Sequence, residues 1–122
     1  MHIETLSPRA IFKLNQVLGR FYADAVNAFL QKYSLDKTRI DAIASHGQTI
    51  FHQPEDGYTV QLGCGSTLAY HSGLPVINDF RSLDVAAGGQ GAPLVGLGDD
   101  LLFNDYDFCL NLGGFCNVST KH

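Results

Sequence analysis

The chain has 122 residues and a mass of 13.3 kDa, and 45% of its residues are hydrophobic against 16% charged. That balance excludes intrinsic disorder, and no apolar run approaches the roughly 18 residues that a membrane span needs. Eight Lys and Arg against twelve Asp and Glu give a formal net charge of −4, which argues against a nucleic-acid partner. Residues 1–4 lack the basic start and apolar stretch of a signal peptide, so we expect one cytoplasmic domain.

The cysteines carry little sign of chemistry. Cys64, Cys109 and Cys116 are odd in number and match no zinc or haem spacing, so we expect reduced, mostly buried thiols. The histidines fit no zinc rule either, and we assign no metal ligands.

The first predicted element is a long helix that begins at Ser7-Pro8 and ends near Ser34. Serine is a favoured N-cap, and proline fits the first helical position. Apolar residues then recur at intervals of three and four from Ile11 to Tyr33. Because this stripe is wide and aromatic, we expect it to pack in the core against a sheet or another helix.

A short apolar strand is predicted over residues 40–44, and it runs into the polar stretch 45–49. Open α/β sheets place ligands at the carboxyl ends of such strands. Residues 50–52 and 58–62 flank an Asp-Gly turn, which predicts a β-hairpin.

The second half of the chain is rich in glycine and short elements. We expect a helix over 66–72 closed by Gly73, a strand over 74–78, a glycine-dense loop over 85–93, a partial helix over 94–103, and strands over 107–112 and 115–119. Strands that alternate with helices predict an α/β sheet.

Two loops could contact a ligand. In residues 88–93 three glycines surround Gln90, which permits positive φ and close backbone approach. Asp79, Arg81 and Asp84 lie just upstream, and the set suits a polyhydroxylated or carboxylated small molecule, with a mobile loop and a solvated charge pair as the alternatives. The Gly113-Gly114 turn offers backbone N–H groups to a phosphate, or is an ordinary hairpin.

Five blocks of the sequence share one order and spacing with a known family. They are Ser45-His46-Gly47-Gln48-Thr49, Val60-Gln61-Leu62-Gly63, Asp79-Phe80-Arg81 with Asp84, Gly88-Gly89-Gln90-Gly91-Ala92-Pro93-Leu94-Val95, and Asn111-Leu112-Gly113-Gly114-Phe115 with Asn117-Val118-Ser119. From about Leu14 to Ser119 the chain thereby resembles the anhydro-N-acetylmuramic acid kinase family.

The resemblance implies an α/β fold, namely a partial actin/hexokinase/Hsp70-like (ribonuclease H-like) lobe with an inserted β-hairpin. It implies that residues 1–105 form most of the sugar-side lobe without its first strands, and that 106–122 form the first strand and hairpin of the second lobe. The family uses ATP, with Mg²⁺ bridging the phosphates, to hydrate and phosphorylate 1,6-anhydro-N-acetylmuramic acid. The product is N-acetylmuramic acid 6-phosphate, in cell-wall recycling.

The resemblance also implies the site residues. Those expected near the sugar are His46, Gln48, Thr49, Asp79, Arg81, Gly89, Gln90 and Gly91. Gly113, Gly114 and Asn117 match a nucleotide phosphate hairpin. The family's other phosphate hairpin and its catalytic Asp have no match in these residues, so we expect no catalytic residue, no bound ATP or Mg²⁺ and no kinase activity from this chain alone. Ser82 and Leu83 stand where the family commonly has arginines.

Two other functions stay open at this point. A non-catalytic sugar-binding module would keep Asp79, Arg81 and the glycine loop without the nucleotide side. A small Rossmann-like nucleotide binder is disfavoured because its fingerprint is missing. We expect a homo-oligomer, since unpaired strand edges recruit partners and the family resembled is dimeric. Its ligand is expected to be a small amino sugar, with no nucleic-acid or membrane partner.

Overall fold

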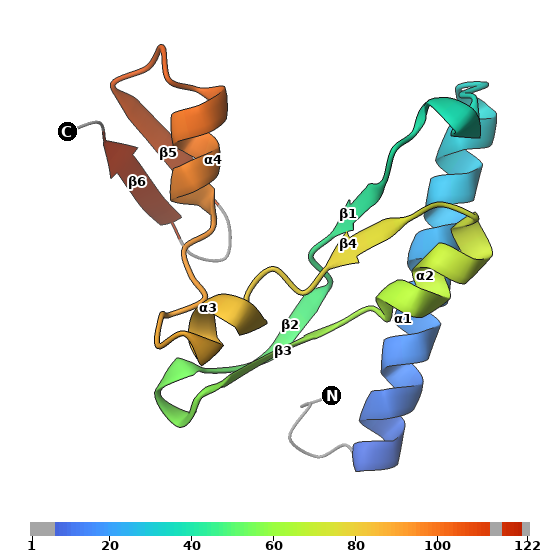
Figure 1. Cartoon of the computed structure of the whole chain (residues 1–122), viewed down its shortest axis with the longest axis horizontal. Coiled ribbons are helices and arrows are strands. Elements are labelled where there is room, and N and C mark those ends of the chain that lie inside the picture. The colour runs from blue at the N-terminus through green and yellow to red at the C-terminus, as the bar shows by residue number, and fades with distance from the viewer. Residues whose placement is uncertain (1–6, 113–115, 121–122) are drawn as a thin grey trace.

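The structure is a computed structural model, and it describes residues 7–112 and 116–120 (Figure 1). Its elements in chain order are α1 (Pro8–Lys32), η2 (Lys37–Arg39), β1 (Ile43–Ser45), β2 (Gln48–Gln53), η3 (Pro54–Asp56), β3 (Tyr58–Leu62), α2 (Gly65–Ser72), β4 (Val76–Asn78), α3 (Ser82–Ala86), α4 (Val95–Leu102), β5 (Phe108–Leu112) and β6 (Cys116–Thr120). The predicted α/β composition is confirmed. Within the described residues, every helix is too short or too polar to cross a membrane.

The long first helix is confirmed at both ends. The Ser7 hydroxyl accepts a hydrogen bond from the Ala10 N–H at 3.3 Å, Pro8 occupies the first turn, and Tyr33 is the C-cap. These local signals are independent of the rest of the fold, which is why the sequence predicts them well.

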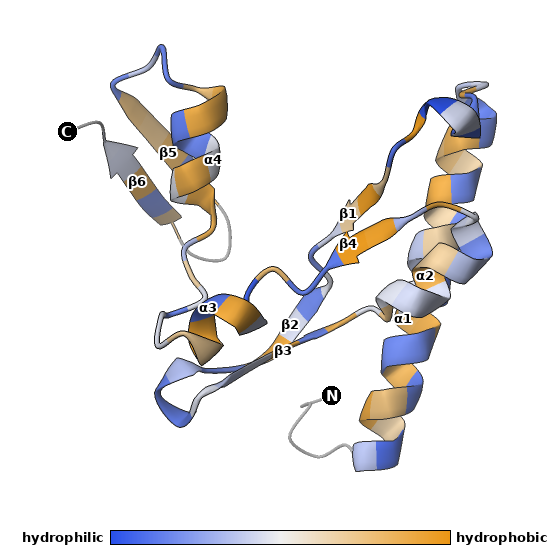
Figure 2. Ribbon diagram, viewed as in Figure 1, coloured by the Kyte–Doolittle hydropathy of each residue, from blue (hydrophilic) through white to orange (hydrophobic). Residues whose placement is uncertain are grey.

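The expectation that the apolar stripe of α1 packs in the core is wrong for much of its length. Val17, Phe21 and Phe29 are 54%, 63% and 55% exposed, and Figure 2 shows apolar residues along the whole of α1. The helix is covered mainly by α2 and by part of β3. Its apolar residues surround more of the helix than those two elements can cover.

Within residues 7–112 and 116–120 the strands form three separate two-stranded sheets. β1 and β4 are parallel, with Ile43 opposite Val76 and Ser45 opposite Asn78. Both strands are shorter than predicted. The first begins only after the 3₁₀ turn η2, and the other begins after Pro75, which has no N–H to donate to a ladder.

β2 and β3 form the hairpin that the sequence predicts. They pair antiparallel from Gln48 opposite Leu62 to Gln53 opposite Tyr58. The short turn η3 ends at Gly57, whose φ of 81° lies in the left-handed region that favours glycine.

A small core joins α1, α2 and the strands. Its buried apolar side chains are Ala23, Leu30, Leu62, Leu68, Leu74 and Val85. The helix α2 ends at Gly73 in the left-handed conformation, as predicted. At the crossing of the two helices, a Cβ at Gly19 would lie 2.6 Å from the Cys64 carbonyl oxygen. The close approach of α1 and α2 therefore depends on this glycine.

Residues 82–86 form the helix α3, so the glycine-dense loop begins later than predicted. Within that loop Gly88 and Gly91 adopt φ values of 90° and 63°. The sequence signal for a loop came from the glycines, and these all lie after the helix has ended.

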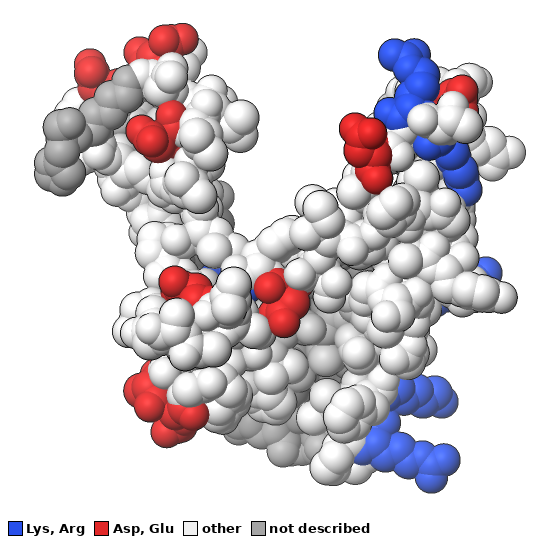
Figure 3. Space-filling model, viewed as in Figure 1, with Lys and Arg blue, Asp and Glu red and all other residues white. Residues whose placement is uncertain are grey.

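The elements α4, β5 and β6, here called the C-terminal unit, stand apart from α1 and the β1–β4 pair (Figure 1). The Ser119 hydroxyl donates to the Asp99 carboxylate at 2.7 Å and ties β6 to α4. Figure 3 shows Lys and Arg at both ends of α1, and Asp and Glu on the C-terminal unit and the β2–β3 turn.

The expectation of mostly buried thiols is wrong. Cys64 and Cys109 are half-buried and Cys116 is exposed, and all three are free cysteines. The core is too small to enclose them.

Candidate functional site

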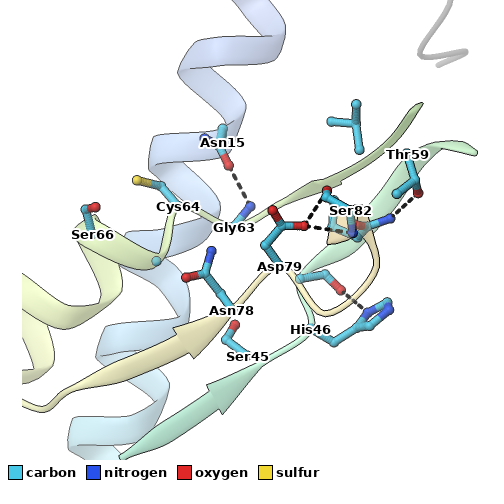
Figure 4. A pocket seen from close by; sticks show the side chains of 14 residues that line it. Asn15, Ser45, His46, Thr59, Gly63, Cys64, Ser66, Asn78, Asp79 and Ser82 are labelled. Atoms are coloured by element: carbon cyan, nitrogen blue, oxygen red, sulfur yellow. Dashed lines mark hydrogen bonds between the residues drawn. The ribbon is translucent and has the colours of Figure 1, made fainter. Parts of the chain in front are cut away.

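A cavity of about 360 Å³ opens at the carboxyl ends of the parallel strands β1 and β4 (Figure 4). Parallel strands bring the residues that follow them to the same edge, which is where α/β folds place ligands. Its lining is mostly polar and comes from five segments of the chain. The residues are Asn15, Ser45, His46, Gly47, Thr59, Val60, Gln61, Gly63, Cys64, Gly65, Ser66, Asn78, Asp79 and Ser82.

Two hydrogen bonds to Asn15 join one wall of the cavity to α1. The Asn15 side-chain oxygen accepts a hydrogen bond from the Gly63 N–H at 2.7 Å, and the Asn15 carbonyl accepts one from the Cys64 N–H at 3.1 Å. Gly47 lies against the end of β3, because a Cβ there would come within 2.5 Å of the Leu62 carbonyl oxygen. Together these contacts set the position of β3 and the start of α2.

Cys64 is the N-cap of α2 and lines the cavity. A hydrogen bond from the Thr67 side chain is the main reason that the pKa of the Cys64 thiol lies below its ordinary value. Backbone N–H groups at the start of the helix act in the same direction, while partial burial opposes them. At a given pH, Cys64 therefore has a larger thiolate fraction than a cysteine with the ordinary pKa.

Asp79 follows β4 and adopts a φ of 60°, which is uncommon for a residue with a side chain. Its Oδ1 accepts a hydrogen bond from the Ser82 hydroxyl at 2.5 Å and one from the Ser82 N–H at 3.4 Å. This arrangement turns the chain from β4 into α3 and leaves the exposed carboxylate on the cavity lining.

His46 is held by two hydrogen bonds that assign its tautomer. The Arg81 Nε–H donates to His46 Nε2 at 2.8 Å, and His46 Nδ1 lies 3.0 Å from the Gly47 carbonyl oxygen. A guanidinium only donates and a carbonyl only accepts. The imidazole is therefore neutral, with its proton on Nδ1 and its Nε2 lone pair directed at Arg81.

The structure brings together only part of the predicted set of sugar residues. His46 and Asp79 line the cavity. Arg81 reaches it through His46, and an Nη1 hydrogen bond to the Gly91 carbonyl connects the glycine loop to the same group. Gly89 packs against the Asp84 carboxylate.

Three other predicted sugar residues lie away from the cavity lining. Gln48 and Thr49 start β2, where the Gln48 side chain donates to the Thr49 carbonyl at 3.3 Å and the Thr49 hydroxyl accepts from Gln61 at 3.3 Å. Gln90 is exposed on the loop.

Of the predicted phosphate residues, Asn117 lies on β6 of the C-terminal unit, opposite Asn111, and is exposed. Gly113 and Gly114 lie outside the described residues. Within residues 7–112 and 116–120, no cluster of three or more His, Cys, Asp or Glu could hold a metal.

Several lining residues escaped prediction from the sequence, among them Asn15, Ser66 and Asn78. Asn15 carries a signal that could have found it, because it is a polar residue beside the apolar stripe of a helix. Asn78 immediately precedes Asp79, and Gly65 packs so closely on its side chain that a Cβ would lie 2.6 Å from Asn78 Oδ1. Ser66 gives no comparable signal.

The structure is that of an α/β protein with a polar cavity at the carboxyl ends of its parallel strands β1 and β4. Residues 3–122 match the family model described as anhydro-N-acetylmuramic acid kinase. The chain belongs to that family.

Three similar proteins carry the name anhydro-N-acetylmuramic acid kinase. One from Shewanella denitrificans is 46% identical over 112 residues, covering 88% of this chain and 30% of its own length. One from Methylobacterium nodulans is 43% identical and covers 96% of this chain and 33% of its own. One from Bordetella petrii is 50% identical and covers 85% of this chain and 28% of its own. The chain thus spans about a third of the length of the curated relatives it matches.

Proposed function

We propose that this chain supplies the sugar-binding side of an ATP-dependent kinase. The kinase hydrates and phosphorylates 1,6-anhydro-N-acetylmuramic acid to N-acetylmuramic acid 6-phosphate. The observation that carries the proposal is the cavity at the ends of β1 and β4, where Ser45, His46 and Asp79 come together. Family membership supplies the reaction class.

The chemistry of the lining suits an amino sugar. Asp79 offers a carboxylate that accepts from sugar hydroxyls, and Asn15 and Asn78 offer amides that both donate and accept. Ring hydroxyls and an acetamido group need this mixture of donors and acceptors, and a cavity of about 360 Å³ is of the size that small-molecule sites have.

The phosphate side of the proposal rests on the C-terminal unit. Asn117, with Gly113 and Gly114, is proposed to hold the phosphates of ATP, which supplies the transferred phosphoryl group, with Mg²⁺ neutralising the phosphate charge. We propose residues 106–122 as the beginning of a second lobe and residues 1–105 as part of an actin/hexokinase/Hsp70-like sugar-side lobe, with β2–β3 as its inserted hairpin. The separate position of β5 and β6 in Figure 1 supports this division. Cytoplasmic cell-wall recycling is the proposed setting.

The test is calorimetric titration of the 122-residue chain with 1,6-anhydro-N-acetylmuramic acid. We expect saturable binding, and reduced affinity in Asp79→Asn, which keeps the size of the side chain but removes its charge. Asp41→Asn is the matched control, because Asp41 is exposed and lies outside the cavity lining. Absence of binding by the folded wild-type chain contradicts the proposal.

A second candidate is a sugar-binding module without catalysis, which is favoured by the fact that the whole described lining of the cavity lies within residues 15–82. A coupled ADP-release assay with ATP, Mg²⁺ and the sugar tests whether the 122-residue chain catalyses phosphoryl transfer by itself. Phosphoryl transfer needs the phosphates, the metal and the base in position together. From these 122 residues alone we expect sugar binding without ADP release, and turnover above background overturns that expectation.

A further inference from the structure

Hydrogen bonds join the glycine loop to Asp84 in α3 and to Arg81, the N-cap of that helix. Gly91 is buried, and its N–H donates to Asp84 Oδ2 at 2.6 Å, while its carbonyl accepts from the Arg81 guanidinium. The Gly89 N–H donates to the Asp84 backbone carbonyl at 2.8 Å. The Asp84 carboxylate therefore lies inside the loop, next to Gly89 and Gly91, whose N–H groups both donate to Asp84.

Glycine is required at both contacts. A Cβ at Gly89 would collide with the Asp84 carboxylate, and Gly91 has a φ of 63° with its would-be Cβ 2.8 Å from Val85 Cγ2. The spacing of these glycines thus serves the approach of the loop to Asp84 and α3.

Arg81 divides its donors between the loop and the cavity. One nitrogen donates to Gly91, and Nε donates to His46 Nε2 at 2.8 Å. No ion pair joins Arg81 to Asp84 within the described residues. The side-chain contact between Asp84 and Arg81 therefore runs through Gly91, and the contact with His46 runs through Arg81.

We propose that Asp84 is a positioning residue for the cavity: by holding Gly91, it holds the Arg81 guanidinium in the place where Nε fixes His46 as the neutral Nδ1–H tautomer. Its importance for sugar binding rests on the proposed function above. Asp84 itself lies outside the cavity lining, so its effect on the ligand is indirect.

The first test uses the free 122-residue chain and two variants, Asp84→Asn and Asp84→Ala. Nuclear magnetic resonance measures the hydrogen exchange of the Gly91 amide and the ¹⁵N signals of the His46 ring. A charge-assisted hydrogen bond is roughly twice as strong as a neutral one, so Asp84→Asn should accelerate Gly91 exchange about fivefold, and Asp84→Ala should accelerate it more. The His46 ¹⁵N signals should shift from those of the Nδ1–H tautomer toward those of a mixture of tautomers. This shift should be larger in Asp84→Ala than in Asp84→Asn.

The His46 signals separate positioning from a merely structural role. Asp41→Asn is the matched control, and both readouts should equal those of the wild type. If Gly91 exchange rises while the His46 signals stay at their wild-type values, the proposal is wrong. It is equally wrong if Gly91 exchange does not change. Should Asp84→Ala fail to fold, Asp84→Asn decides by the same two readouts, because it keeps the volume of the side chain.

The second test asks whether the effect reaches the ligand. Calorimetry with 1,6-anhydro-N-acetylmuramic acid should show weaker binding by Asp84→Asn, by about the same factor as its Gly91 exchange, and wild-type binding by Asp41→Asn. If the wild type binds no sugar, the proposed function fails, while the readouts on free protein still decide the role of Asp84. If the sugar binds equally well to Asp84→Asn, the positioning role is contradicted.

Discussion

Cys64 shows most clearly how single side chains set the properties of the cavity. Hydrogen bonds from Thr67 and from the start of α2 keep its pKa below the ordinary value. A lower pKa gives more thiolate at a given pH, and the thiolate is the form that reacts with alkylating reagents.

Removal of the Thr67 hydroxyl should therefore raise the pKa of Cys64. In Thr67→Val we expect the pH profile of Cys64 alkylation by iodoacetamide, followed by mass spectrometry, to shift to higher pH, with a slower rate at pH 7. Cys109 and Cys116 in the same sample are internal controls whose rates should not change. An unchanged or faster rate at Cys64 in Thr67→Val is the outcome that this explanation cannot accommodate.

Residue types at strand ends could be read from the sequence, but their partners could not. His46, Asp79 and Arg81 were predicted near the ligand, and the structure joins them around one edge. The contact of Asn15 with Gly63 spans 48 positions, and the grip of Asp84 on Gly91 depends on the helix α3. The first contact needs the tertiary fold to bring its groups together. The second spans seven positions, and it needs the helix α3, which the glycine pattern does not predict.

At the level of elements, the crossing of α1 over α2 leaves no room for a side chain at Gly19. Alanine in place of glycine in a helix ordinarily stabilises it by about 1 kcal/mol. At Gly19 the added Cβ meets the Cys64 carbonyl oxygen at 2.6 Å and Thr67 Cβ at 3.1 Å. Overpacking of this kind costs roughly 1–3 kcal/mol, so the clash should outweigh the helix gain.

We expect Gly19→Ala to lower the free energy of unfolding by up to about 2 kcal/mol, measured by urea denaturation. The matched control is Gly98→Ala in α4, where an added Cβ meets nothing within 4 Å. That variant should keep or slightly raise the stability. Equal effects at the two sites would show that helix propensity, and not the α1–α2 approach, decides the outcome.

Elements with local signals were predictable and their assembly was not. The N-cap of α1, the glycine end of α2 and the β2–β3 hairpin each follow from a few adjacent residues. The division into three strand pairs, and the exposure of the aromatic side chains of α1, depend on which surfaces meet. Apolar periodicity states that a face is apolar, but not that another element covers it.

At the scale of the whole molecule, the C-terminal unit carries a row of exposed apolar side chains. Phe108, Leu110 and Leu112 project from one face of β5 and are 72%, 62% and 74% exposed. Exposed apolar patches of this kind on a strand promote association.

We therefore expect the 122-residue chain to self-associate, as measured by light scattering against concentration. Leu110→Lys should weaken the association, because it places a charge on this face. Leu83→Lys is the control, since Leu83 is 81% exposed and lies on α3, outside the C-terminal unit. A monomer at all concentrations, or equal effects of the two variants, argues against this surface.

The central claim is that the ends of β1 and β4 bind the amino sugar. Titration of the ¹⁵N-labelled chain with 1,6-anhydro-N-acetylmuramic acid, followed by nuclear magnetic resonance, tests it residue by residue. We predict saturable shifts at Gly47, Gly63 and Asp79, with Asn117 unchanged in the absence of nucleotide. Shifts confined to the C-terminal unit, or no saturable shift in the folded chain, would contradict the claim.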